Sequence, residues 1–271
     1  MPECGRQDVA ATIIIHLGGI KMNISLYLQL GLIMAFIVGV VSATDNQIPN
    51  DIQTAVVDAL TKADLISFTD ESEQSRELIQ TVREEFTNIT GQISDYSGSG
   101  EITSDTAGLL TDYIQLWDTL LVAYDFMIQG GDHKLKGYDA ILSNETNRYE
   151  TGLQEFKAAK EMYDNAYEGL NNTQSLFSSF DVNTMSELLP DASIPSLVSV
   201  NKMLFRLRDT ALICQAYQDF CSAEIAKETS GDVNSTEVQE PLNAATTMMK
   251  KLIPSPYVGQ EAELFANITF T

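Results

Sequence analysis

The sequence is short of basic residues, cysteine and histidine, and each shortage excludes a class of protein. Its 271 residues contain 16 Lys and Arg against 38 Asp and Glu, so the formal net charge is −22. Phosphate backbones and anionic lipid headgroups would repel such a chain, which argues against binding to nucleic acid or to a membrane surface. With 3 Cys it is not a small disulfide scaffold, and with 16 Gly and 7 Pro it is neither collagen-like nor of low complexity.

The residues that common catalytic and cofactor sites need are also scarce. His133 is the only histidine after residue 43, and its Gly-Gly-Asp-His-Lys surroundings predict a solvated turn. The chain therefore lacks a histidine-oriented nucleophile, a set of zinc ligands, a phosphate loop and a Glu-x-x-His metal motif. The segment from Asp232 to Thr236 resembles the start of a calcium loop, but it lacks the required glycine and the closing glutamate. We predict no enzymatic activity, no cofactor and no metal.

The longest apolar run lies near the N-terminus, at residues 24–41. Lys21 precedes it, and small residues up to Ala43 follow it before the chain turns polar at Thr44. A charged start, an apolar middle and a small-residue end are typical of a secretory signal, so residues 22–43 are predicted to be one, cleaved between Ala43 and Thr44. The run is also just long enough to span a bilayer, which leaves an uncleaved anchor as the alternative. Either outcome places the protein outside the cell or on its surface.

Residues 1–21 fit poorly in front of a signal peptide. Met22 opens directly into the apolar run, and Gly18-Gly19 requires a purine-rich stretch of codons that suits a ribosome-binding site. We therefore interpret residues 1–21 as a start-site artefact in a prokaryotic gene, with a genuine N-terminal extension as the alternative. Residues 44–271 are then one exported domain that keeps the charge of −22, because residues 1–43 hold two basic and two acidic residues.

Residues 44–271 carry apolar residues at helical spacing, without the alternation that marks strands. The pattern predicts an all-α antiparallel bundle of about five to seven helices. The expected helices cover residues 51–68, 70–96, 105–129, 134–170, 171–189, 195–227 and 241–253, and the tail 264–271 is expected to be an extended arm. The helix over 134–170 should be a long central rod of roughly 55 Å, kinked near Gly152.

The aromatic residues of these helices are expected to pack in the core. Trp117, the only tryptophan, lies in the most apolar stretch of residues 105–129, so it should be buried between the second and fourth expected helices. Four tyrosines of the expected rod have a second interpretation, because tyrosine also suits a ligand groove with a wet end. They are Tyr138, Tyr149, Tyr163 and Tyr167.

Cys214 and Cys221 lie seven residues apart in an expected helix. Two helical turns separate their Cα atoms by about 10.5 Å, whereas a disulfide needs them within about 7 Å. We therefore predict two reduced, buried thiols on one apolar stripe rather than a bridge.

Five Asn-x-Ser/Thr sequons follow the signal, about twice the number that composition alone would produce. In an exported protein they are candidate glycan acceptors on exposed faces. Those at Asn171 and Asn234 are expected at helix boundaries. The five acceptors are Asn88, Asn144, Asn171, Asn234 and Asn267.

These features predict an exported, non-enzymatic helical bundle that acts at the cell surface as a structural or interaction module, with an unidentified protein or cell-surface partner. The alternative is an extracytoplasmic bundle that binds a small molecule, as sensory domains do. Such domains usually precede a membrane helix and a cytoplasmic region; this sequence has neither after residue 44, which favours the first function unless residues 24–41 remain as an anchor. An exported hydrolase that uses carboxylates alone ranks third.

Overall fold

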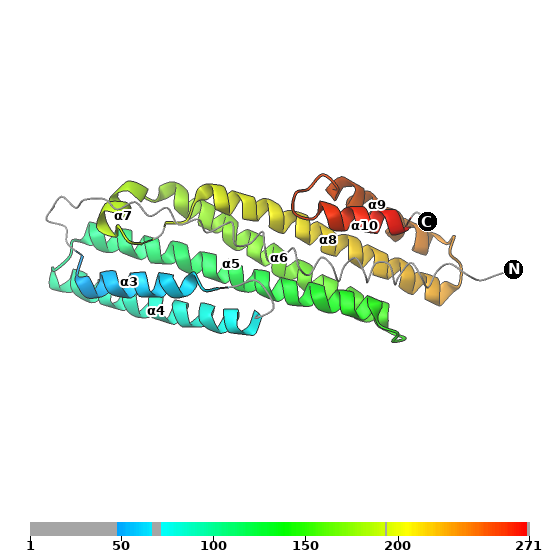
Figure 1. Cartoon of the computed structure of the whole chain (residues 1–271), viewed down its shortest axis with the longest axis horizontal. Coiled ribbons are helices and arrows are strands. Elements are labelled where there is room, and N and C mark those ends of the chain that lie inside the picture. The colour runs from blue at the N-terminus through cyan, green and yellow to red at the C-terminus, as the bar shows by residue number, and fades with distance from the viewer. Residues whose placement is uncertain (1–47, 67–71, 193, 270–271) are drawn as a thin grey trace. The chain divides into compact units, whose positions relative to one another are not determined.

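The computed structural model describes residues 48–66, 72–192 and 194–269 (Figure 1). These residues form eight helices and no strand, so the predicted all-α helical bundle is confirmed for the described part of the chain. The helices are α3 (Asn50–Ala63), α4 (Ser72–Ser99), α5 (Ser104–Leu142), α6 (Arg148–Ser179), α7 (Val182–Leu188), α8 (Leu197–Ser230), α9 (Thr236–Leu252) and α10 (Gly259–Thr269). The described helices exceed the expected five to seven by one.

The chain divides into two compact units, and α5, α6 and α8 each contribute residues to both. We call the first the α3–α4 unit; it comprises the described parts of Tyr27–Asp125 together with Glu168–Met203. The second, the α9–α10 unit, comprises Phe126–Tyr167 and Leu204–Thr271 among the described residues.

In the α3–α4 unit, side-chain pairs show the direction of neighbouring helices. Arg76 of α4 pairs with Asp125 of α5 at 2.7 Å, and Arg83 pairs with Asp118 at 2.6 Å. Residue numbers rise along α4 while they fall along α5, so these two helices run in opposite directions. The antiparallel order of the complete bundle stays a prediction.

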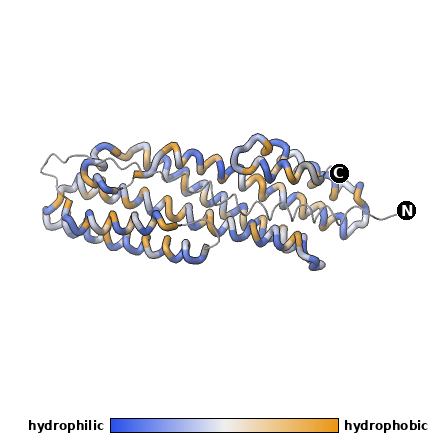
Figure 2. Tube along the Cα trace, viewed as in Figure 1, coloured by the Kyte–Doolittle hydropathy of each residue, from blue (hydrophilic) through white to orange (hydrophobic). Residues whose placement is uncertain are grey.

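The first two described helices form where the apolar spacing predicts them. In α3 the buried residues recur every three or four positions and make one apolar stripe. They are Ile52, Val56, Ala59, Leu60 and Ala63. In α4 the same spacing buries Val82, Phe86, Ile89 and Ile93. Figure 2 shows apolar and polar residues interleaved along the helices. Gly100, with φ of 78°, follows the last residue of α4 and supplies the left-handed conformation that ends many helices.

The predicted break at Gly130-Gly131 is wrong, and so is the predicted rod over residues 134–170. Helix α5 continues through both glycines to Leu142, and the chain breaks instead at residues 143–147 before α6 begins. The glycines serve close packing: a Cβ at Gly130 would lie 3.1 Å from the Tyr163 ring, and one at Gly137 would lie 2.9 Å from the Phe156 ring. Tertiary contacts therefore outweigh the weak helix propensity of glycine at these positions.

The region after Leu170 also differs from prediction. Helix α6 extends to Ser179, and a separate short helix, α7, follows. Asp181 begins α7, because its carboxylate accepts a hydrogen bond from the Thr184 N–H at 3.1 Å. Such an N-cap satisfies one of the free amide groups at a helix start.

At the C-terminal end, α9 begins five residues before Pro241, and residues 264–269, predicted as part of an extended arm, belong to α10. Pro241 is therefore inside α9, where the buried Val238 anchors an additional turn. The sequence offered a signal for α10, since Val258, Ala262 and Phe265 have helical spacing and are all buried. Figure 1 shows α9 and α10 beside α8, in the unit to which they belong.

Candidate functional site

A buried network of a carboxylate, an ammonium and a phenol joins α10 to α5 in the α9–α10 unit. Lys134 Nζ donates to Glu261 Oε2 at 2.8 Å, and the Tyr138 hydroxyl donates to Glu261 Oε1. The Lys134 and Glu261 side chains are only 13% and 12% exposed. Both oxygens of the buried carboxylate therefore have a partner, as a buried charge requires.

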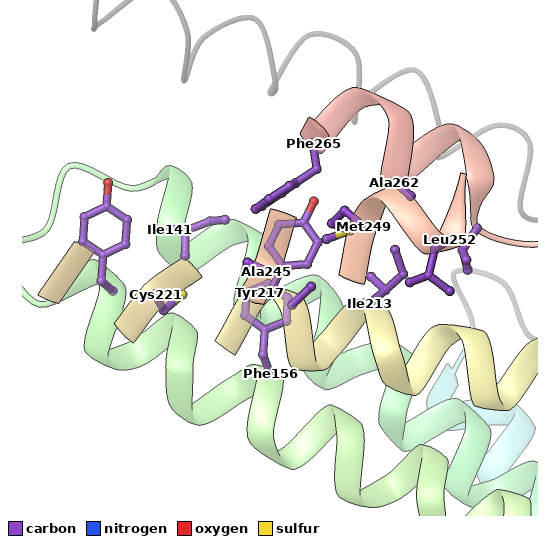
Figure 3. Close-up of a cluster of buried hydrophobic side chains, with 13 residues drawn as sticks. Ile141, Phe156, Ile213, Tyr217, Cys221, Ala245, Met249, Leu252, Ala262 and Phe265 are labelled. Atoms are coloured by element: carbon purple, nitrogen blue, oxygen red, sulfur yellow. The ribbon is translucent and has the colours of Figure 1, made fainter. Parts of the chain in front are cut away.

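Aromatic side chains surround this network. The Tyr138 ring meets the edges of Phe156 and Tyr217, with ring centroids 5.3 and 5.1 Å apart, and Phe156 stacks on Tyr217 at 4.8 Å. Phe265 of α10 packs edge-on against Tyr217 at 5.3 Å. Figure 3 shows the side chains of Phe265 and Met249 directed toward the side chain of Tyr217, in one buried cluster. These offset and edge-on contacts are the favoured arrangements of aromatic pairs.

Burial changes the acidity of the groups around this network. It raises the pKa of Tyr217 and of Tyr138 well above the ordinary value, and the Glu261 charge adds to the effect at Tyr138. Burial also raises the pKa of Cys214 and of Cys221 to about 12. At neutral pH the phenols and thiols keep their protons, so Tyr138 acts as a hydrogen-bond donor and neither thiol is a nucleophile.

The prediction of two reduced, buried thiols is confirmed: Cys214 and Cys221 are unpaired and buried within α8. The network of Lys134, Tyr138 and Glu261, in contrast, was missed from sequence. Its two charged members lie 127 positions apart, and α10 was expected to be extended. Because its groups satisfy one another, the network acts as a clasp that fixes α10 to α5.

His133 is not in a solvated turn, which corrects the sequence prediction. It lies within α5 and its Nδ1 contacts Glu155 Oε2 of α6 at 2.7 Å. The imidazole is about one-third exposed, at 33%. The turn was predicted because Gly130 and Gly131 usually end a helix. Here α5 continues through both glycines, since Gly130 packs closely against the Tyr163 ring.

The surface of the α9–α10 unit carries an apolar groove between α8 and α9. Its volume is about 500 Å³, and its lining is mostly the aliphatic surface of two helices. It is lined by Leu212, Asn243, Ala244, Thr247, Met248, Lys251 and Leu252. Phe205, Ile253 and Tyr257, in the same unit, are 53%, 39% and 40% exposed. An apolar groove and exposed aromatic and aliphatic side chains in one unit are features of binding surfaces.

A second groove, of about 400 Å³, lies on α4 and α5 in the other unit. Its lining is more polar and includes the ion pair of Arg83 with Asp118. The four tyrosines that sequence analysis proposed for a ligand groove line neither of these two grooves. Tyr149 and Tyr163 are core residues, whereas Tyr167 is 40% exposed.

In the part of the chain that the structure describes, no group of three or more His, Cys, Asp or Glu side chains is arranged to hold a metal ion. Within the loop that resembles the start of a calcium site, the Asp232 carboxylate accepts a hydrogen bond from the Asn234 N–H at 2.9 Å. This contact shapes the turn that leads from α8 into α9.

The sequons lie on several elements. Asn88 of α4, Asn144 of the α5–α6 connection, Asn171 of α6 and Asn234 of the α8–α9 loop are exposed. Asn171 is inside α6, so the expectation that it marks a helix boundary is wrong, whereas Asn234 does precede α9. Asn267 lies in α10. All five remain candidate glycan acceptors.

The predicted extension over 1–21, the signal or anchor over 22–43 and the cleavage point between Ala43 and Thr44 lie outside the described residues. Among the helices that are described, none combines the length and the apolar character that crossing a bilayer would require.

In the described part of the chain, the helices form an all-α bundle whose α9–α10 unit carries the clasp and an apolar surface groove, and whose other unit carries a more polar groove. No protein-family model, no curated protein and no solved structure matches the chain.

Proposed function

We propose that this chain is an exported, non-enzymatic helical bundle that acts at the cell surface as an interaction module. The observation that carries the proposal is the apolar groove between α8 and α9, in a unit where Phe205, Ile253 and Tyr257 stay exposed. Soluble proteins seldom leave contiguous apolar surface uncovered unless it binds something. The predicted signal over residues 22–43 supports the location.

The buried ionisable groups favour a role that does not depend on catalysis. Glu261 is held by Lys134 and Tyr138, and burial keeps the phenol and the nearby thiols protonated. A general acid or base has to reach its substrate and exchange a proton near neutral pH. A clasp whose groups satisfy one another is suited to stability instead.

Cross-linking on intact cells tests the proposal. Cells that produce the tagged chain are fractionated, treated with a membrane-impermeant cross-linker and analysed by mass spectrometry. We expect the chain in the surface or extracellular fraction, beginning at Thr44 or retaining residues 24–41, and cross-linked to another surface component. A chain that stays in the cytoplasm, or that forms no cross-link to another protein, would contradict the proposal.

Small-molecule binding is the second candidate function, because a volume of about 500 Å³ falls within the range of ligand pockets. Native mass spectrometry of the protein purified from its own cells distinguishes the two functions. A retained small molecule, lost on substitution of Met248 by Glu, would favour the second.

A further inference from the structure

Basic residues outnumber acids in two segments of the α9–α10 unit, one in α8 and one in α9 with the turn that follows it. Residues 204–218 contain one acid, Asp209, and residues 241–260 contain none. These two segments nevertheless hold four of the basic residues that follow residue 43: Arg206, Arg208, Lys250 and Lys251. In a chain with a net charge of −22, this arrangement creates a local positive region on a negative molecule.

Contacts within the α9–α10 unit bring the two segments together. The Ser255 hydroxyl donates to Asp209 Oδ2 at 2.7 Å, so the turn after α9 lies against α8. Arg208 pairs with Asp209 and lies over the Phe205 ring, 5.3 Å from its centroid. Leu212 lies one helical turn after Arg208 on the same face of α8. It lines the groove together with residues of α9.

Arg206 is the informative residue of this surface. It is half-buried, and it forms no ion pair with any carboxylate of the described residues. Burial lowers the pKa of its guanidinium, and the nearby phenols of Tyr163 and Tyr257 counter that shift. Desolvating a guanidinium without a carboxylate partner is costly, and this chain has many carboxylates to offer.

We infer that the α8–α9 groove, which Leu212 and Lys251 line, together with Phe205, Arg206 and Tyr257 of the same unit, binds an acidic amphipathic helix of a partner protein. The inference rests on the proposed function as an interaction module and names the chemistry of its partner. The apolar groove accepts the apolar face of such a helix, in the helix-in-groove mode. Arg206 and Lys251 meet the carboxylates on its flanks, and Arg and Tyr are the residues that dominate binding energies at interfaces.

A second copy of the chain is a weaker occupant, because two molecules of charge −22 repel one another. An anionic lipid surface would also attract the arginines, but it would experience the repulsion of the remaining acidic surface over its whole area.

The test uses synthetic helical peptides and the whole protein at physiological ionic strength, where salt screens the long-range attraction between a basic peptide and a protein of charge −22. The probe peptide carries Leu along one face and Glu elsewhere; one control peptide replaces each Glu by Lys and another replaces each Leu by Ala. We expect the Leu/Glu peptide to bind and both controls to bind at least about tenfold more weakly, with added salt weakening the interaction.

Variants locate the binding surface. Arg206→Gln and Lys251→Glu should each weaken peptide binding by about tenfold or more. Lys157→Glu, the matched charge reversal on the exposed part of α6, should leave binding unchanged. Because Arg206 is half-buried, the exposed Phe205→Ser and Lys251→Glu variants keep the test independent of any folding defect, which circular dichroism would reveal.

Several results would overturn the inference: no binding of the Leu/Glu peptide, equal binding of the Lys peptide, or affinity that the surface variants leave intact. So would binding to phosphatidylglycerol vesicles without binding to peptide, or a concentration-dependent dimer in sedimentation that Lys251→Glu abolishes. Cross-links from another face to a surface component would preserve the proposed function while removing this surface from it.

Discussion

Trp117 is a single residue whose burial is expected to contribute strongly to the stability of this protein. Its burial, predicted from the apolar residues around it, is confirmed: it is 5% exposed within α5. We expect Trp117→Ala to lower the free energy of unfolding by about 3–5 kcal/mol, because the substitution removes buried surface and leaves a cavity. Chemical denaturation measures the loss, and Trp117→Phe should cost less since it refills most of the space.

Fluorescence provides an independent check on the same residue. A buried indole emits at shorter wavelength and iodide quenches it poorly. Red-shifted emission that iodide quenches readily would contradict the burial of Trp117, and a loss of stability below about 1 kcal/mol in the Ala variant would do the same.

Gly152 is the second residue at which close packing can be measured. A Cβ there would lie 2.5 Å from Ile141 Cγ2 and 3.3 Å from Cys221 Sγ. We expect Gly152→Ala to destabilise the protein by about 1–3 kcal/mol through overpacking. Gly91, an exposed position inside α4, has nothing within 4 Å of the added methyl group. Gly91→Ala should therefore stabilise by about 0.5–1 kcal/mol. Urea denaturation of both variants measures whether the free energy of unfolding rises or falls. A rise in Gly152→Ala would contradict the prediction, because it would show that Ile141 and Cys221 move aside at little cost.

At the scale of elements, the clasp determines how firmly α10 is held. Lys134→Met leaves the buried Glu261 carboxylate with Tyr138 as its remaining partner. We therefore expect the free energy of unfolding to fall by about 3 kcal/mol, the lower end of the range for breaking a buried ion pair. Hydrogen exchange should accelerate first in α10 and at the end of α9. Adding Glu261→Gln should recover part of the loss, since no charge then stays buried.

A surface pair is the matched control for the clasp. Lys62 of α3 pairs with Glu85 of α4, and these side chains are 42% and 30% exposed. Lys62→Met should cost no more than about 1 kcal/mol, because exposed ion pairs contribute little. If Lys62→Met and Lys134→Met cost the same, the clasp does not stabilise α10 in the way proposed.

For the whole molecule, buried tyrosines and thiols predict sensitivity to alkaline pH. Burial raises the pKa of Tyr124 to about 12, as it does for Cys214 and Cys221. Unfolded thiols and phenols lose their protons near pH 8.5 and 10 respectively, whereas the folded groups keep theirs until about pH 12. The unfolded state thus binds fewer protons above about pH 8.5, so the free energy of unfolding should fall as the pH rises through this window.

Urea midpoints between pH 7 and 11 measure this effect. Cys221→Ala should show a shallower fall than the unchanged chain, because one of the shifted groups is gone. The thiols should also react with a disulfide reagent at pH 8 only after denaturation. A midpoint that stays level up to pH 11, or rapid thiol labelling of the native protein, would contradict the prediction.

The pattern of apolar residues was sufficient to predict the all-α class, the helices α3, α4 and most of α8, and the burial of Trp117, Cys214 and Cys221. These features depend on local spacing, because apolar residues every three or four positions make a stripe that only a helix can bury as one surface. The predicted signal and the sequons are local patterns of the same kind, and they stay predictions.

Tertiary structure alone decided where α5 ends and what Glu261 does. Glycines usually weaken a helix, yet at Gly130 and Gly137 the rings of Tyr163 and Phe156 occupy the space that side chains would fill. Glu261 finds its partners on another helix, far away in sequence. No local pattern reports either contact, because the energy of both comes from a neighbouring helix that is placed only when the whole unit folds.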